Sequence, residues 1–332
     1  MGNKEKYIKF CEDMNINIFS QYWWLDAVSG KDNWDVILNE KGGKILGALP
    51  YSFDTTNKGL IINQSKLTQK NGIYIDYPNN QKYTSRLSFE RKIIDGLIDE
   101  LEKKDMKSYT QNFDYSFTNW LPFYWRGYNQ TSRYTYVIEE TNDFESVYNN
   151  IDSSTKNLIR KAKKIVQIKT GMDIEKFYKI NKMTFERKEM NIPYSLELLK
   201  RIEDVCLSHN CRKSFYAVDK NNNIHAAVYV VWDKESMYYL LGGINPEFKN
   251  SNATSLLLLE AIKLAGRMNL KFDFEGSMNK DIEKFFSSFG GYQKQYFTIT
   301  KNFKFDLKQS VLNFILGAPK LRKLAKSIKN RK

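Results

Sequence analysis

Alternating apolar and polar positions near the start of the chain predict a β-hairpin. Residues 34–53 form two apolar runs on either side of a polar turn at 40–43. A short helix is expected just before this hairpin, over residues 21–29. The first half therefore contains a helix–strand–turn–strand unit.

The same order of elements recurs in the second half. Three apolar runs separated by polar turns predict strands at 213–218, 224–232 and 237–244. Two amphipathic segments, 174–188 and 195–209, predict helices upstream of them. This recurrence indicates duplication of one α/β unit.

A crossover follows the last of these strands. After a polar loop, an apolar helix is expected over 253–268 and a strand over 270–275. A connection of this length implies parallel strands and places the helix N-terminus beside a strand end, where backbone N–H groups suit a phosphate. The candidate cofactor-binding residues are therefore those at this helix start: Lys249, Asn252, Ala253 and Thr254.

A polar segment at 139–152 separates the two halves. It leads into a basic helix for which Ser153 or Ser154 is the expected N-cap. We expect an α/β (α+β) protein with a first domain over 1–140, a second over 141–304 and a tail over 305–332. In the tail, apolar residues at 321, 324, 325 and 328 predict a short basic amphipathic helix.

Composition supports this division. With 332 residues, of which 42% are hydrophobic, the chain can fill two cores. The net charge of +14 lies mostly at the end, because residues 301–332 hold ten Lys or Arg and one acid, which leaves +5 for the rest. The basic surface is therefore a property of the tail, and a nucleic-acid-binding body is not indicated.

Cysteine and histidine usage gives no prediction of a metal or of a nucleophilic site. Cys206, His209 and Cys211 lack the spacing and the fourth ligand of a structural zinc site, so no metal is expected. Three cysteines, no spanning apolar stretch and no secretory h-region at the N-terminus favour the cytoplasm, with peripheral contact to the inner face of the membrane through the basic segment 318–332.

Five stretches together resemble the FemABX superfamily, in particular its BioF2-like, GNAT-type acetyltransferase branch. They are IFSQYWWLDAV, LPFYWRGYNQTSRYTY, NLIRKAKK, TFERKEM and DFEGSM with the following FFSSFGG. The resemblance implies two tandem GNAT-like domains, each with a mixed central sheet flanked by helices. It further implies that the second domain binds an activated donor and that a cleft between the domains holds an amine acceptor.

The donor stays open between acyl-CoA and aminoacyl-tRNA. The pyrophosphate loop of GNAT enzymes is rich in small residues, whereas Asn252 and Thr254 stand at those places here. The family's aminoacyl ligases carry Phe-Lys where this chain has Phe285-Phe286, and no long helical arm fits between Asp173 and Lys213.

Two acids are the candidates for catalysis. Attack by an amine needs a group that accepts its proton, and in the Phe-Asp-Phe-Glu run at 272–275 strand alternation sends Asp273 and Glu275 to one face. The alternative is structural, because either acid could pair with a lysine or cap the turn at Gly276-Ser277.

Arginines and aromatic residues are the candidates for substrate binding. Arg126, Arg133 and Tyr134 lie in an aromatic-rich stretch where a guanidinium could hold a phosphate or carboxylate, or where the arginines tie the domains together.

Three further places in the resembling motifs supply candidates. Trp24 lies in the first motif and Phe285 before the final Phe-Gly-Gly, while Glu186 and Arg187 end the Thr-x-x-Arg helix. Trp24 is alternatively a core residue, and Glu186 is alternatively a partner within its own helix.

The expected function is transfer of an acyl or aminoacyl group, in one direct step, to an amine of a cell-envelope glycan or peptidoglycan-type precursor. The expected partners are that glycan or peptide precursor, tRNA and an anionic membrane surface. The alternative is a non-catalytic module that binds RNA or a lipid-linked glycan at the membrane surface.

Overall fold

The fold is built on one continuous sheet that runs through both halves. The computed structural model describes residues 2–57 and 59–303, so the predicted tail helix lies outside the described residues. The strands of the first half are β1 (Trp34–Lys41), β2 (Lys44–Thr56), β3 (Gly59–Asn63), β4 (Tyr74–Ile75), β5 (Met106–Phe113) and β6 (Asn129–Ile138). Those of the second half are β7 (Gln167–Thr170), β8 (Arg212–Val218), β9 (Ile224–Trp232), β10 (Ser236–Ile244), β11 (Lys271–Asp273) and β12 (Tyr292–Asn302).

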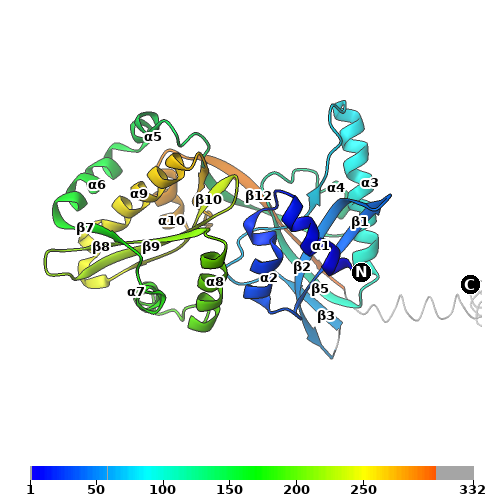
Figure 1. Cartoon of the computed structure of the whole chain (residues 1–332), viewed down its shortest axis with the longest axis horizontal. Helices are drawn as coiled ribbons and strands as arrows, with labels where there is room; N and C mark the ends of the chain where they lie inside the picture. Colours follow the sequence, from blue (N-terminus) through cyan, green and yellow to red (C-terminus); the bar gives the residue numbers. More distant parts are fainter. Residues whose placement is uncertain (1, 58, 304–332) are drawn as a thin grey trace, which may run out of the picture.

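The last described strand lies in the middle of this sheet. The order is β1-β2-β3-β5-β12-β6-β11-β10-β9-β8-β7, with β4 paired to β2 at the side. Strand β12 is antiparallel to both β5 and β6 and so joins the two halves by backbone hydrogen bonds (Figure 1). The predicted hairpins β1–β2 and β8–β9–β10 and the parallel pair β10–β11 are confirmed.

Helices cover both faces of the sheet (Figure 1). In the first half they are α1 (Asn3–Asp13), η1 (Ile18–Ser20), α2 (Tyr22–Ser29), α3 (Tyr83–Glu102) and α4 (Leu121–Trp125). In the second half they are α5 (Phe144–Asn150), α6 (Ser153–Ile165), α7 (Ile174–Glu186), α8 (Leu196–Ser208), η2 (Pro246–Ser251), α9 (Ala253–Arg267) and α10 (Lys280–Ser287). The predicted N-cap of α6 was wrong by one or two residues, because the side chain of Asp152 accepts the hydrogen bond from the Ser154 amide.

Two cores lie on opposite faces of the second half. Helices α6, α9 and α10 pack on one face against Phe272 and Phe274. Helices α7 and α8 pack on the other face together with η1 and α2 of the first half, so that this core contains side chains from both halves. A third core lies between α3 and the first-half strands. The halves are therefore joined by a shared core as well as by a shared sheet.

The predicted fold class is confirmed, since a large mixed sheet is flanked by helices in both halves. The division at 140/141 stays a prediction. Strand β6 precedes it and yet pairs with β11 and β12 of the second half. Within the described residues, no helix is both long and apolar enough to cross a bilayer.

Candidate functional site

The parallel strands β10 and β11 part soon after they meet. Their pairing covers only residues 236–238 and 271–273, and β10 has a bulge between Tyr239 and Leu241. Beyond Tyr238, β10 continues to Ile244 with β9 as its strand partner, while β11 ends at Asp273. The predicted strand end at 275 was thus two residues too far, because Glu275 has a left-handed backbone.

A buried cluster of charged side chains lies where the two strands separate. Lys70, from the loop before β4, forms a short ion pair with Asp273. Its Nζ lies 3.6 Å from Glu275 Oε1 and 3.9 Å from Asp114 Oδ2. Lys70, Asp273 and Glu275 are all at least 97% buried. The strand alternation is confirmed, since Asp273 and Glu275 face this cluster and the neighbouring phenylalanines face the opposite core.

Asp273 is the fully bonded acid of the pair. Its Oδ1 accepts hydrogen bonds from Thr135 Oγ1 at 2.5 Å and from the Glu275 amide at 2.8 Å, and Oδ2 faces Lys70. The same ion pair raises the pKa of the Lys70 ammonium against the opposing effect of burial. Asp273 therefore fixes the turn and the lysine.

Glu275 is the acid with spare hydrogen-bonding capacity. Neither of its carboxyl oxygens accepts a hydrogen bond from the described residues. Burial raises the pKa of this carboxyl well above its usual value, Lys70 opposes that rise, and Asp273 and Asp114 add to it. A buried carboxyl with a raised pKa and no bonded partner is a candidate proton acceptor.

The backbone at Glu275 is held in an uncommon conformation. Glu275 has φ of 60° and Gly276 has φ of 61°. A Cβ added at Gly276 would lie 2.0 Å from the Tyr134 carbonyl oxygen, so β6 leaves room only for glycine there. This tight turn aims the Glu275 side chain into the cluster, and strained backbone of this kind is frequent at functional sites.

Lys70 was absent from the predicted site. It lies in a loop of Gln, Lys, Asn and Gly, 203 residues away from Asp273 in sequence, and nothing in that composition sets it apart from a solvent-exposed lysine. Tyr115 and Tyr238, whose rings lie 4.8 and 5.4 Å from Lys70 Nζ, were also missed.

An acidic cleft between the halves reaches this cluster. A cavity of about 270 Å³ is lined by Asp114 and Tyr115 from the first half and by Asp233, Glu235 and Tyr238 from the second. Asp114, Tyr115 and Tyr238 also surround Lys70, so these three residues separate the cavity from the buried cluster. The three carboxylates outnumber Lys271, which lines the same cavity, and so favour a cationic ligand.

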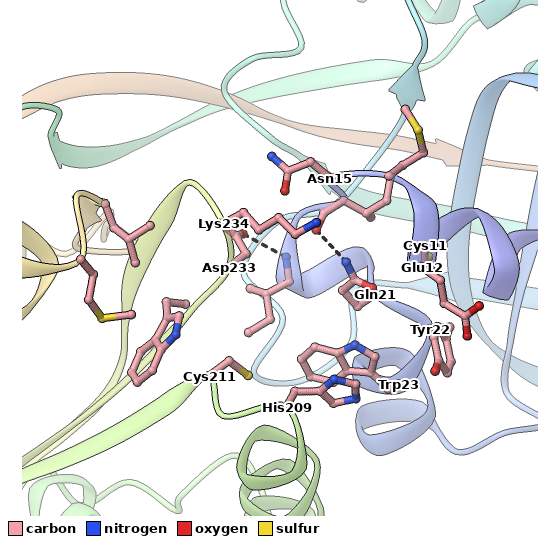
Figure 2. A pocket seen from close by; sticks show the side chains of 16 residues that line it. Cys11, Glu12, Asn15, Gln21, Tyr22, Trp23, His209, Cys211, Asp233 and Lys234 are labelled. Atoms are coloured by element: carbon pink, nitrogen blue, oxygen red, sulfur yellow. Dashed lines mark hydrogen bonds between the residues drawn. The ribbon is translucent and has the colours of Figure 1, made fainter.

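A larger, less polar cavity adjoins the acidic cleft. It has a volume of about 580 Å³ and shares Asn15, Ile16 and Asp233 with the acidic cleft. Figure 2 shows Trp23 and His209 on one side of it and Asn15 and Lys234 on the other. The Trp23 and His209 rings stack with centroids 4.2 Å apart, and the Ile18 amide donates to Asp233 at 3.1 Å, so both halves build the walls.

The predicted cofactor-binding residues surround a separate cavity at the start of α9. This cavity, of about 240 Å³, is lined by all four of them, Lys249, Asn252, Ala253 and Thr254, and by Phe285 of α10. Asn252, the N-cap, makes no side-chain cap hydrogen bond. His225 of β9 also lines the cavity and is 4% exposed; its Nε2 lies 3.4 Å from Asp219 Oδ2, and its ring stacks on Phe248 with centroids 4.3 Å apart. The helix start without a side-chain cap, with Lys249 beside it, suits an anionic group.

The predicted arginines lie in different places. Arg126 pairs with Asp95, Asp99 and Glu102 of α3, at 3.3, 2.5 and 3.8 Å, so its guanidinium is bound within the first half. Arg133 is exposed on β6 and interacts with Tyr296, whose pKa is raised by burial and by the charge of Glu275. Arg133 is therefore the predicted arginine that lies near the buried cluster.

The other predicted contacts are spread over the molecule. Tyr134, half-buried, is adjacent to Arg133 on β6. Trp24 has no exposed surface, donates to Thr68 Oγ1 at 2.9 Å and belongs to the shared core, which gives it the alternative, structural role. Glu186 pairs with Lys182 of its own helix at 3.1 Å, and Arg187 is exposed beyond the end of α7.

Among the described residues, no group of three or more His, Cys, Asp or Glu side chains has the arrangement of a metal site. The buried cluster instead has a lysine at its centre. This lysine places a positive charge between the carboxyl groups of Asp273, Glu275 and Asp114.

The sequence of the second half matches one family model. Residues 148–280 match the family model of the acetyltransferase (GNAT) domain. This match spans α6, the β10–α9–β11 crossover and both acids of the cluster. No curated protein matches the sequence of the chain.

Solved structures extend the likeness to the whole described fold. The structure of FemX has a TM-score of 0.68 at 11% identity and covers 90% of this chain and 96% of its own. The C-terminal domain of a putative lysylphosphatidylglycerol synthetase from Agrobacterium fabrum has a TM-score of 0.58 at 9% identity, with 91% and 93% covered. A tandem GNAT protein from the clavulanic acid biosynthesis pathway has a TM-score of 0.51 at 10% identity, with 90% and 94% covered. The predicted resemblance to FemABX proteins and to tandem GNAT proteins is thus confirmed at the level of the fold.

Proposed function

We propose that this protein transfers an acyl or aminoacyl group from an activated donor directly to an amine bound between the two halves. The observation that carries the proposal is the Glu275 carboxyl, buried and without a hydrogen-bond partner among the described residues, at the point where β10 and β11 part. The GNAT match of residues 148–280 and the FemX-like fold support this class of reaction.

The chemical step requires a neutral amine. The amine nitrogen attacks the carbonyl carbon of a thioester or ester, a C–N bond forms, and the C–S or C–O bond breaks. Glu275 takes the proton that the nitrogen loses and returns it to the departing thiolate or alkoxide, and its raised pKa makes its carboxylate a better match for an amine than an ordinary glutamate. Lys70 at 3.6 Å keeps the ionised form accessible in a buried site.

Asp273 and Thr135 act as positioning residues in this scheme. Asp273 accepts a hydrogen bond from the Glu275 amide and pairs with Lys70, so it fixes the positions of both residues. Thr135 donates to the other side of the same carboxylate at 2.5 Å. Glu275 is therefore the group to which proton transfer is assigned.

The donor is assigned to the cavity at the start of α9. Its phosphate would lie against the uncapped helix N-terminus, with Lys249, Asn252, Ala253 and Thr254 around it. From Ile244, which lines this cavity, to Tyr238 at the cluster is six residues of strand, or about 20 Å. A donor with an extended arm can span that length, and both acyl-CoA and the 3′ end of aminoacyl-tRNA have one.

The acceptor is assigned to the acidic cleft. Asp114, Asp233 and Glu235 attract a protonated amine and favour acceptors with few negative charges near it. We propose an amine of an envelope glycan or peptide precursor, whose remaining bulk would extend into the adjoining cavity of about 580 Å³.

Donor binding is tested by thermal shift with coenzyme A, a panel of acyl-CoA thioesters and total aminoacyl-tRNA. A ligand at 100 times its Kd should stabilise the fold by about 2.7 kcal/mol. The variant Thr254→Trp fills the cavity at α9 and should lose this response, whereas Thr298→Trp, on β12, tests the effect of a new indole elsewhere. If no donor stabilises the protein, or if Thr254→Trp responds as the parent does, the donor assignment is wrong.

Transfer itself is tested with the donor so found and a panel of amino sugars and aminoacyl peptides. Glu275→Gln should retain donor binding and lower the transfer rate by about 10²- to 10⁴-fold. Full transfer by Glu275→Gln would overturn the catalytic role, and donor binding without transfer by the parent protein to any amine would favour a binding module.

A further inference from the structure

One tyrosine on strand β10 has a hydroxyl group that the fold itself does not use. Tyr239 is half-buried, and its hydroxyl makes no hydrogen bond or ion pair with the described residues. The hydroxyls of two nearby tyrosines are bonded, since Tyr238 donates to Asp233 at 2.9 Å and Tyr136 donates to Glu283. A phenol that is largely removed from water and has no partner lowers stability, so it indicates a group available to a ligand.

Tyr239 stands at the point where β10 and β11 part. The last residue pair of these strands joins Tyr238 to Asp273, and the bulge of β10 follows Tyr239. The Tyr239 side chain packs on the face of the sheet that α9 and α10 cover, whereas Tyr238 faces Lys70 on the opposite side. Tyr239 and the Glu275 carboxyl therefore lie on opposite faces of the sheet at the same point.

The phenol extends along β10 towards the cavity assigned to the donor. A Cβ added at Gly242 would lie 1.9 Å from the Tyr239 hydroxyl oxygen, so this oxygen lies directly against the Gly242 backbone. Gly242 is two residues before Ile244, which lines the donor cavity. The ring also packs edge-on against Phe286, with centroids 5.8 Å apart, and the adjacent Phe285 lines the same cavity. A donor arm that runs from this cavity to the point where the strands part would pass close to the hydroxyl.

Two backbone groups of the same strand segment are already bonded to α7. The Gly242 carbonyl accepts a hydrogen bond from Asn181 Nδ2 at 2.6 Å. The Ile244 amide donates to Thr184 Oγ1 at 3.0 Å. These backbone groups are therefore not available to a donor, whereas the Tyr239 hydroxyl beside them is free to donate a hydrogen bond.

We propose that the Tyr239 hydroxyl donates a hydrogen bond to the carbonyl oxygen of the group being transferred. This inference rests on the proposed transfer reaction and adds a catalytic residue to it. When the amine nitrogen attacks the carbonyl carbon, the C–N bond forms and the π electrons of the C=O bond move to oxygen. The hydrogen bond stabilises the negative charge on that oxygen until the C=O bond forms again and the C–S or C–O bond breaks. Tyr239 keeps its proton throughout, because burial raises the pKa of its phenol.

The test is Tyr239→Phe in the full chain, assayed with the acyl-CoA or aminoacyl-tRNA that stabilises the parent protein and with the amine that the parent acylates. Loss of the hydroxyl should lower kcat by about 10²- to 10³-fold. The thermal shift given by the donor and the KM of the amine should equal those of the parent, because the ring and its packing remain. The unfolding free energy should not fall, because this hydroxyl has no bonded partner among the described residues.

Two other tyrosine variants serve as controls. Tyr128→Phe removes a buried hydroxyl from the core of the first half and should keep the full kcat. Tyr229→Phe removes a hydroxyl that donates to Glu203 at 2.6 Å, and it should lower the unfolding free energy. The comparison separates a hydroxyl used in the reaction from one used in the fold.

The other outcomes decide against the inference. Full kcat in Tyr239→Phe, together with slow transfer by Glu275→Gln, would show that the hydroxyl takes no part, and the proposed function would stand. An unchanged kcat with a raised KM or a lost thermal shift would make Tyr239 a binding residue only. An unfolding free energy lowered as much as in Tyr229→Phe would make the hydroxyl structural. If the parent protein transfers to no amine, the proposed function fails and this inference fails with it.

Discussion

Glu275 combines three unfavourable properties in one residue: burial, a carboxyl without a hydrogen-bond partner among the described residues, and a left-handed backbone. Each lowers the stability of the fold, and their coincidence at the end of β11 is what sets this residue apart from Asp273. Asp273 is equally buried, but its oxygens are bonded to Thr135, the Glu275 amide and Lys70. The two acids on one strand face thus differ in role: Asp273 is structural, and Glu275 is available for chemistry.

Replacing Glu275 by glutamine should stabilise the protein increasingly as pH rises. The folded-state pKa of Glu275 is raised, so above its unfolded value of about 4.5 the folded state binds more protons than the unfolded state and stability falls with pH. Glutamine removes this loss, at about 1.4 kcal/mol for each unit by which the pKa is raised. Urea unfolding of both proteins from pH 4 to 9 measures the difference between their unfolding free energies at each pH.

The control for this experiment is Glu145→Gln, at an exposed position. It should follow the parent protein at every pH. A constant difference between Glu275→Gln and the parent from pH 4 to 9 would show that the carboxyl is not perturbed as described.

Lys70→Met should destabilise the fold by about 3–5 kcal/mol at pH 7, because it leaves the Asp273 carboxyl buried without its cation. The pKa of Lys70 is raised, so the stabilisation is fully present at neutral pH and below. Lys70→Met with Asp273→Asn should recover much of the loss, because the orphaned charge is gone. Chemical denaturation of the four proteins of this cycle gives the coupling.

Lys103→Met provides the comparison. Lys103 pairs with Glu100 at 2.5 Å, and both side chains are more than half exposed. This variant should therefore lose no more than about 1 kcal/mol of unfolding free energy. Equal effects at positions 70 and 103, or additive losses in the cycle, would contradict a strongly coupled buried pair.

The sequence allowed the positions of Asp273 and Glu275 to be predicted but not that of Lys70, for a physical reason. Strand alternation is local, so Phe272, Asp273, Phe274 and Glu275 could be assigned to faces from the sequence alone. Lys70 reaches the cluster through tertiary packing, and a lysine in a polar loop has the same local pattern whether it is buried or exposed. The alternative that an acid pairs with a lysine was correct, but the partner was not predictable.

At the scale of elements, turns decide where the functional side chains point. The strands and helices of the second half were predicted within a few residues, because apolar periodicity is strong there. The turn after β11 was not, since the sequence Glu-Gly-Ser is compatible with several conformations. In the structure its tightness comes from β6, whose Tyr134 carbonyl lies against Gly276.

Gly276→Ala should therefore displace this turn and lower both stability and transfer. The new Cβ would lie 2.0 Å from the Tyr134 carbonyl oxygen and adds strain at positive φ, together more than about 2 kcal/mol. Gly171→Ala is the matched control, because Gly171 also has positive φ, at 77°, but its Cβ would meet nothing within 4 Å. It isolates the conformational cost, about 1 kcal/mol. Similar unfolding free energies for the two variants would contradict close packing of the turn on β6.

At the scale of the whole molecule, the order of strands could not have been predicted from periodicity. The duplicated helix–strand–turn–strand pattern suggested two units joined by a linker near 140. In the structure, β12 comes from the end of the described chain and yet lies between β5 and β6. Which strands become neighbours depends on long-range pairing, and that leaves no local pattern in the sequence. The acidic cleft between the halves depends on this arrangement, so the residues that line it could not be predicted from the sequence either.

This topology predicts that the two halves unfold together. Scanning calorimetry of the full chain should give one transition with a calorimetric enthalpy equal to the van't Hoff enthalpy. The reasons are the shared sheet through β12 and the shared core that combines η1 and α2 with α7 and α8. Two resolved transitions would show that these connections are too weak to couple the halves.

Cutting the chain at 140/141 tests the same topology more severely. Fragment 1–140 would keep β6 but lose both of its neighbours, β12 and β11, and β5 would become an unprotected edge. Fragment 141–332 would leave β12 without a strand partner on either side and would lose the part of its core that Ile18, Phe19 and Trp24 supply. Neither fragment should show a cooperative transition alone, whereas a mixture of the two should recover one by reassembly. If fragment 1–140 folds cooperatively alone, β12 is an addition to a complete first sheet, and the acidic cleft would then lie between two bodies free to move against each other.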